Sequence, residues 1–128
     1  MTFDPVPVFM SALSAKFPDI KVFGGSIPKG EDAVPLILVR SVIRRPATAP
    51  TTQWWLHILS VDVHSTDPAE SVQLAFDAEL TVNAIVGGQD DGSVAYCEVV
   101  SVENIEDGAW TPTRFRNVLT VELTARNL

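Results

Sequence analysis

The sequence predicts an α+β fold: a mainly antiparallel sheet of four to five strands, two helices packed on one face, and a long projecting hairpin. Two kinds of segment lead to this prediction. Two segments place apolar residues at helical spacing behind a capping signal, and five others are apolar, β-branched or alternating in polarity. The order is one helix, three strands, a second helix and two strands, without a dividing linker. We therefore expect residues 1–128 to form one domain.

Both predicted helices begin with an aspartate followed by a proline. Asp4-Pro5 and Asp67-Pro68 each place a capping carboxylate before a proline at the first helical position. The first helix is expected to end before Pro18, and Gly87-Gly88 to stop the second. Apolar residues follow one face of each helix: Val6, Phe9, Met10, Leu13 and Phe17 in the first, and Ala69, Val72, Phe76 and Leu80 in the second.

Five segments have the composition of strands. They are Lys21 to Phe23, Leu36 to Ile43, Trp54 to His64, Val94 to Val102, and Arg116 to Arg126. The third segment alternates clearly in its second half. Its inward residues are predicted to be Leu59, Val61 and Val63, and its polar solvent face Ser60, Asp62 and His64.

The third strand is too long for a compact body. A strand from Gln53 to Ser65 would run about 43 Å, whereas a compact chain of this length has a diameter of roughly 36 Å. Its first half is apolar on both faces, and the strand before it ends in two arginines. We therefore predict a projecting hairpin that contacts another subunit through Arg44, Arg45, Trp54, Trp55 and Leu56. The alternative is a tryptophan pair packed under the loop of a monomer.

Charge is segregated along the chain. The net charge is −7, which argues against a nucleic-acid-binding surface. No Lys or Arg occurs between Arg45 and Arg114, and this stretch contains eleven of the sixteen acids. All nine basic residues lie outside it. Such segregation favours head-to-tail contact between identical subunits, although chance in a short acidic protein gives the same pattern.

A search for catalytic, metal and cofactor sites predicts none. Ser60, Asp62 and His64 are the residue types of a hydrolytic triad, but they alternate along one strand with Asp62 between the other two. His57 and His64 are expected on opposite faces of that strand, so a shared metal site is not expected. Cys97 lies in a strand pattern without basic neighbours and is expected to be a buried, inert thiol.

The composition of the chain predicts the cellular compartment in which the protein is made. A single cysteine fits a reducing compartment. The N-terminal residues have neither the positive start nor the apolar core of a signal peptide, and no stretch approaches about 20 apolar residues. We expect a protein that is made and folded in a cytosol and that does not enter a membrane.

A resemblance covers nearly the whole chain. It consists of the first helix, a "PLILV" strand at Pro35 to Val39, the strand "LHILSVDVHS" at Leu56 to Ser65 running into "DPAESVQLAFDAEL" at Asp67 to Leu80, and a final "LTVELTAR" at Leu119 to Arg126. This pattern resembles the tail terminator, or tail completion, proteins of long-tailed bacteriophages.

The resemblance implies a structural protein of the virion tail, made in the bacterial host cytoplasm. It implies a hexameric ring on the head-proximal end of the tail tube, which ends tube growth and joins the tail to the head. The implied partners are identical copies, the tail tube subunit and a head-side connector or head-closure protein. DNA would pass through without specific binding, and no catalytic residues would be present. Two alternatives stay open: another neck or tube subunit, and a small ligand-binding or enzymatic domain with a pocket between helices and sheet.

If DNA passes through such a ring, the excess of acidic residues could line the inner wall of the ring. Carboxylates on the inner wall would repel the duplex and keep it centred, whereas Lys and Arg would hold it. We predict Asp90, Asp91, Glu106 and Asp107 as lumen-facing acids, because they lie in expected turns and loops. Plain solubility is the competing explanation.

Overall fold

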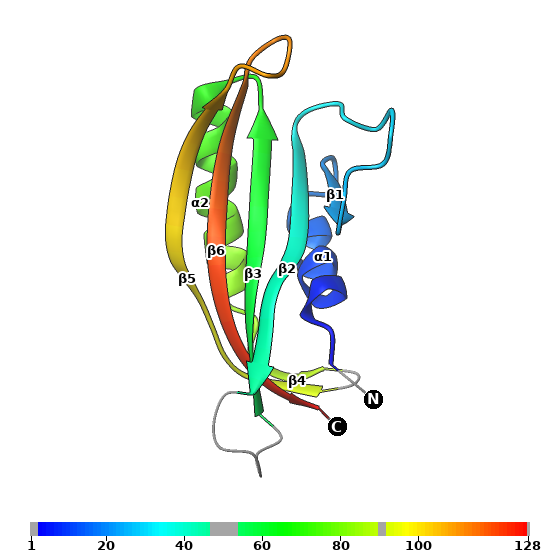
Figure 1. The fold of residues 1–128 in the computed structure, drawn as a ribbon, viewed down its shortest axis with the longest axis vertical. Coiled ribbons are helices and arrows are strands. Elements are labelled where there is room, and N and C mark those ends of the chain that lie inside the picture. Colours follow the sequence, from blue (N-terminus) through cyan, green and yellow to red (C-terminus); the bar gives the residue numbers. More distant parts are fainter. Residues whose placement is uncertain (1–2, 47–53, 90–91, 128) are drawn as a thin grey trace.

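The computed structural model describes residues 3–46, 54–89 and 92–127. Figure 1 shows a long, curled sheet with both helices on the same face. Helix α1 spans Pro5–Lys16 and helix α2 spans Pro68–Asn83. As predicted, Asp4 and Asp67 cap them by accepting hydrogen bonds from Val6 N and Ala69 N, each at 3.0 Å.

The sheet has six strands in the order β1-β2-β3-β6-β5-β4. They span Lys21–Gly24 (β1), Leu36–Pro46 (β2), Trp54–Ser65 (β3), Gly87–Gln89 (β4), Gly92–Asp107 (β5) and Arg114–Asn127 (β6). The pair β1–β2 is parallel and the other pairs are antiparallel. The α+β class is confirmed and the sheet is mainly antiparallel, but it has six strands rather than the predicted four to five, and one pair is parallel.

Two short strands explain the difference. Strand β4 is formed by the glycines that were expected only to stop the second helix; it pairs with the first residues of β5. Glycine is depleted in strands, so composition does not reveal such a strand. Strand β1 runs parallel to β2 because the connecting segment 25–35 lets the chain return to the same end of the sheet.

The core lies between the helices and one face of the sheet. Helix α1 buries Phe9 and Leu13, as its apolar stripe predicts. Helix α2 does not bury the face that its sequence singles out: it packs through Ser71, Leu74, Ala75, Ala78 and Val82, while Val72, Phe76 and Leu80 are each 57% exposed. Small residues permit this close approach, and Asn117 of β6 donates a hydrogen bond to Ser71 Oγ at 2.6 Å.

The β2–β3 hairpin stays within the sheet in the described residues. Strand β3 pairs with β6 along its whole length, from Trp54 opposite Arg126 to Ser65 opposite Phe115. The expected two-stranded projection is therefore not found, because β5 and β6 are also long and the whole domain is elongated (Figure 1). The connecting residues 47–53 lie outside the described part of the chain.

Candidate functional site: two unpaired edges of the sheet

One edge of the sheet is basic and lacks a partner strand. Strand β1 pairs with β2 only from Leu36 to Val39. Beyond this point, the described structure places no strand on the side of residues 40–46 that faces away from β3. Three arginines lie there, Arg40, Arg44 and Arg45, together with Val42 at 58% exposure and Ile43 at 47%. Backbone N–H and C=O groups on an unpaired edge can pair with a strand of another chain.

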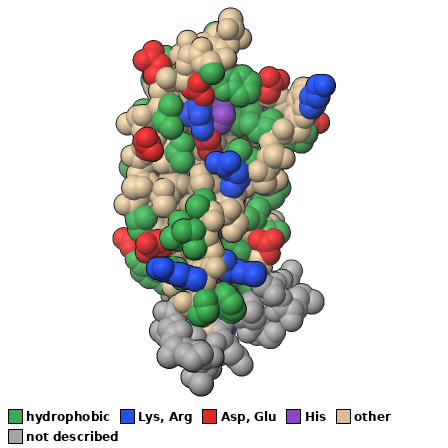
Figure 2. Space-filling model, viewed as in Figure 1, with side chains coloured by type: hydrophobic (Ala, Val, Ile, Leu, Met, Phe, Trp, Pro, Cys, Tyr) green, Lys and Arg blue, Asp and Glu red, His purple; other side chains and the backbone are tan. Residues whose placement is uncertain are grey.

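The predicted interface residues gather at the end of this edge, on both faces of the sheet. The Arg44 guanidinium lies 5.4 Å from the centroid of a Trp55 ring, and Arg126 lies 5.8 Å from one of Trp54. Arg45 pairs in register with Leu56. Figure 2, which views the helix-free face, shows basic side chains at its lower end. These five predicted residues lie near one another, although not on a free hairpin; their contact with another subunit stays a prediction.

The opposite edge is acidic and apolar. Strand β4 pairs only with Gly92 to Val94 of β5, so residues 95–107 have no strand on that side among the described residues. Exposed side chains on this stretch include Tyr96, Val100 and Val102 and the acids Glu98, Glu103 and Glu106.

The exposed apolar face of α2 adjoins this edge. A hollow of about 250 Å³ is lined by Val72 and Phe76 of α2 together with Val102 and Asn104 of β5. We call the exposed α2 residues Val72, Phe76 and Leu80 the α2 stripe. An exposed apolar stripe beside an unpaired strand is typical of a protein-binding surface.

A buried polar cluster lies on the helix-free face of the sheet, at the end away from Arg44 and Arg45. Asp62 is 2% exposed and accepts hydrogen bonds from Arg116 Nε at 3.2 Å and Nη2 at 2.6 Å. Arg116 Nη1 also donates to Asp107 at 3.0 Å. Arg114 lies 3.6 Å from a Trp110 ring centroid and donates to the backbone oxygen of Asp32.

His64 belongs to the same cluster. Arg114 Nη1 lies 3.3 Å from His64 Nδ1, and because guanidinium is only a donor, Nδ1 must accept. The His64 proton is then on Nε2, which lies 3.2 Å from Asp62 Oδ2 without hydrogen-bond alignment. Ser60, Asp62 and His64 were predicted to form a solvent face, yet all are buried. Arg116 covers Asp62, and Arg114 and Trp110 contact His64. No triad forms, since His64 contacts Asp62 rather than Ser60.

The cluster fixes the charge of Asp62. Burial by itself raises the pKa of this carboxyl, but the contacts from His64 and Arg116 outweigh burial, so the pKa is lowered below its ordinary value. The same pairing raises the pKa of Arg116. Both groups are charged at neutral pH, and the cluster is a structural ion-pair network.

Two of the four predicted lumen acids fall within the described residues. Asp90 and Asp91 lie outside the described residues. Glu106 is exposed. Asp107 is paired with Arg116 and caps Ala109 N at 3.1 Å, so its charge is largely offset.

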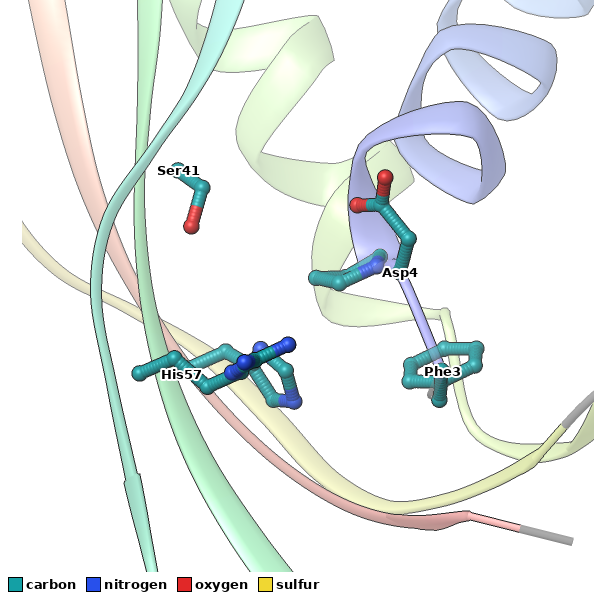
Figure 3. Close-up of a pocket in the computed structure, with 6 residues that line it drawn as sticks. Phe3, Asp4, Ser41 and His57 are labelled. Atoms are coloured by element: carbon teal, nitrogen blue, oxygen red, sulfur yellow. The ribbon is translucent and has the colours of Figure 1, made fainter. Parts of the chain in front are cut away.

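A second polar site lies between α1 and the strands (Figure 3). A hollow of about 410 Å³ is lined by Phe3, Asp4, Pro5, Ser41, Arg44 and His57. His57 is 2% exposed, and neither ring nitrogen has a hydrogen-bond partner in the described structure. Burial lowers the pKa of His57, and Arg44 lowers it further against the opposing effect of Asp4. Ser41 does not bond to the imidazole, so the two are not arranged as nucleophile and base.

Sequence reasoning missed this hollow, although a signal was present. His57 has the same parity as the inward residues Leu59, Val61 and Val63, and a polar residue at an inward position is unusual. The separation of His57 and His64 onto opposite faces is confirmed by the register. Cys97 is buried as predicted, and burial raises its pKa to about 11.

Among the described residues, no three metal-ligating side chains cluster, and no helix is long and apolar enough to cross a membrane. Comparison with models of protein families gives no match, and no curated protein matches the sequence.

Proposed function

We propose that this chain is a structural subunit that joins identical copies head to tail in a ring. The observation that carries the proposal is the pair of unpaired strand edges on opposite sides of one sheet. One edge is basic, at residues 40–46, and the other is acidic, at residues 95–107. Different patches that fit each other on identical subunits produce a heterologous interface, which closes into a ring when the rotation permits.

The α2 stripe supports the same proposal. Three large apolar side chains at helical spacing are exposed on an otherwise well-packed helix. A neighbouring copy that adds to β5 would also cover this stripe and remove apolar surface from water. The acidic and basic edges would then favour the correct partner and orientation.

The place of the ring is proposed from the resemblance to tail terminator proteins. On this proposal, the ring sits at the head-proximal end of a bacteriophage tail tube, stops tube growth and offers a surface to the head connector. The ring would consist of six copies, act without catalysis and let DNA pass without specific binding. Its acidic surplus suits that passage, because acidic side chains do not retain phosphates.

Two measurements test the proposal. Electron microscopy and native mass spectrometry of the concentrated chain, alone and with preformed tail tubes, should show closed rings of six copies or tubes capped at one end. Addition of the chain during tube polymerisation should shorten the tubes. A chain that stays monomeric with and without tubes, and that leaves tube length unchanged, would contradict the proposal.

A further inference from the structure

The two unpaired edges of the sheet share an irregularity. In β2, the register shifts between Ser41 and Ile43 and leaves Val42 as an extra, exposed residue. In β5, the register shifts twice, between Val94 and Tyr96 and between Val99 and Ser101, and the second shift leaves Val100 as an extra, exposed residue. Such a bulge bends its strand and increases the local twist. Two edges that bend at the same point can therefore pair with each other more closely than a bent edge with a straight one.

Opposite charges flank the two bulges at the same spacing. Arg40 and Arg45 flank the β2 bulge, and their register partners on β3 place both on the helix-free face. Glu98 and Glu103 flank the β5 bulge, and their partners on β6 place both on that same face. All four side chains are exposed, so each remains accessible to a second copy.

The directions of the strands also agree. Three successive antiparallel pairings lead from β2 through β3 and β6 to β5, so β2 and β5 run in opposite directions. Two upright copies side by side therefore present these edges for antiparallel pairing. The register that brings the Val42 and Val100 bulges together joins residues that share a face: Arg40 with Glu103, Ser41 with Val102, Ile43 with Ser101, Arg44 with Val99, and Arg45 with Glu98. Within one copy, Val99 N already donates to Asn83 Oδ1 at 2.9 Å, so this amide would have to give up that bond to join the pairing.

We propose that β2 of one copy pairs with β5 of the next in this register, with salt bridges from Arg45 to Glu98 and from Arg40 to Glu103. The inference rests on the proposed ring and names its contacts. Within one copy, pairing across the sheet leads from Arg40 to Ser101, two residues before Glu103. Neighbouring copies would thus be offset by roughly 7 Å along the strands, and closure of a twisted sheet into a ring requires such a stagger.

A shifted register is the main competitor. Pairing of Arg45 with Glu103 would bring Arg40 opposite Asp107 on the same face. That arrangement sets the bulge of β2 against a regular stretch of β5 and gives Arg40 a carboxylate whose charge is already paired with Arg116, whereas Glu98 of the proposed register accepts a hydrogen bond from the neutral Tyr96 hydroxyl. The two registers differ in which glutamate meets Arg45, so they can be separated by experiment.

Charge exchange tests the register. Sedimentation velocity at physiological salt, on the chain with tail tubes where tubes are needed for assembly, should show that Arg45→Glu weakens association at least tenfold. The second substitution Glu98→Arg should restore association to within about threefold of the original chain. The matched control combines Arg45→Glu with Glu103→Arg. This double variant has the same net charge, and its second substitution lies on the same strand, but it should not restore association.

Crosslinking in assembled rings or intact particles gives an independent reading. A short thiol crosslinker should join copies that contain Arg45→Cys and Glu98→Cys, and should join the pair Arg45→Cys and Glu103→Cys far less. If the substitution at position 103 restores association instead, or if crosslinks form through position 103, this register is wrong, but the proposed ring is not contradicted. Assembly that neither exchange affects would overturn the edge pairing. Absence of any ring would overturn the proposed function itself.

Discussion

Replacement of Arg116 should lower the free energy of unfolding, and the contacts of Arg116 in the buried polar cluster set the size of the loss. The substitution Arg116→Gln removes both charge-assisted hydrogen bonds to Asp62, whose carboxylate is 2% exposed. Loss of one partner of a buried pair leaves an uncompensated charge and costs about 3–5 kcal/mol. Because His64 still contacts Asp62 and Arg116 is itself 24% exposed, we expect the lower end, about 3 kcal/mol.

Chemical denaturation at pH 7 measures this loss, and thermal unfolding should show a midpoint about 10 °C lower. The matched control is Arg40→Gln, which removes an exposed arginine from the same sheet and should change stability by about 0.5 kcal/mol or less.

The pH dependence has a defined sign. The pKa of Asp62 is lowered in the folded state, so the cluster's contribution is present above the unfolded value, about 3.9. It is lost as pH falls through the lower folded value. The difference between the original chain and Arg116→Gln should therefore shrink as the pH is lowered below about 4. A variant within about 0.5 kcal/mol of the original chain at pH 7, or a difference that grows in acid, would refute this reasoning.

Three further predictions concern α2, the hollow and the cysteine. Phe76→Ser should change monomer stability by about 1 kcal/mol or less yet weaken association, whereas Leu74→Ala should cost about 2–5 kcal/mol, as denaturation and sedimentation will show. His57→Phe should raise stability by about 1 kcal/mol in denaturant unfolding, because two unsatisfied buried nitrogens are removed; a loss would indicate a hidden partner. Cys97 should react slowly with thiol reagents at pH 8 until denaturant unfolds the chain, since its thiol is buried and protonated.

Local signals in the sequence predicted the helices and the long strands well. The Asp-Pro pairs locate both helix starts because capping depends on residues adjacent in sequence. The alternation of Leu59, Val61 and Val63 correctly identified the helix-covered face of β3. Strand β4 was missed because two of its three residues are glycine, so only its pairing with β5 defines it as a strand.

The surfaces depend on packing that local patterns do not record. Helix α2 has two faces that could be buried, and spacing alone favoured the one with Phe76 over the one with Ala75 and Ala78. The face with the small residues is the one buried, because small side chains let the helix approach the sheet closely. The larger side chains are therefore left exposed. Asp62 and His64 were predicted to face solvent because the arginines that cover them lie some fifty positions later in the chain.

The location of this chain in the virion is the most direct test of the proposed function. Electron microscopy of purified virions, labelled with antibody fragments against this chain, should show density in a ring where the tail tube meets the head, with six fragments in end-on averages. Label along the whole tube, on the head shell, or nowhere on the particle would contradict the proposed role.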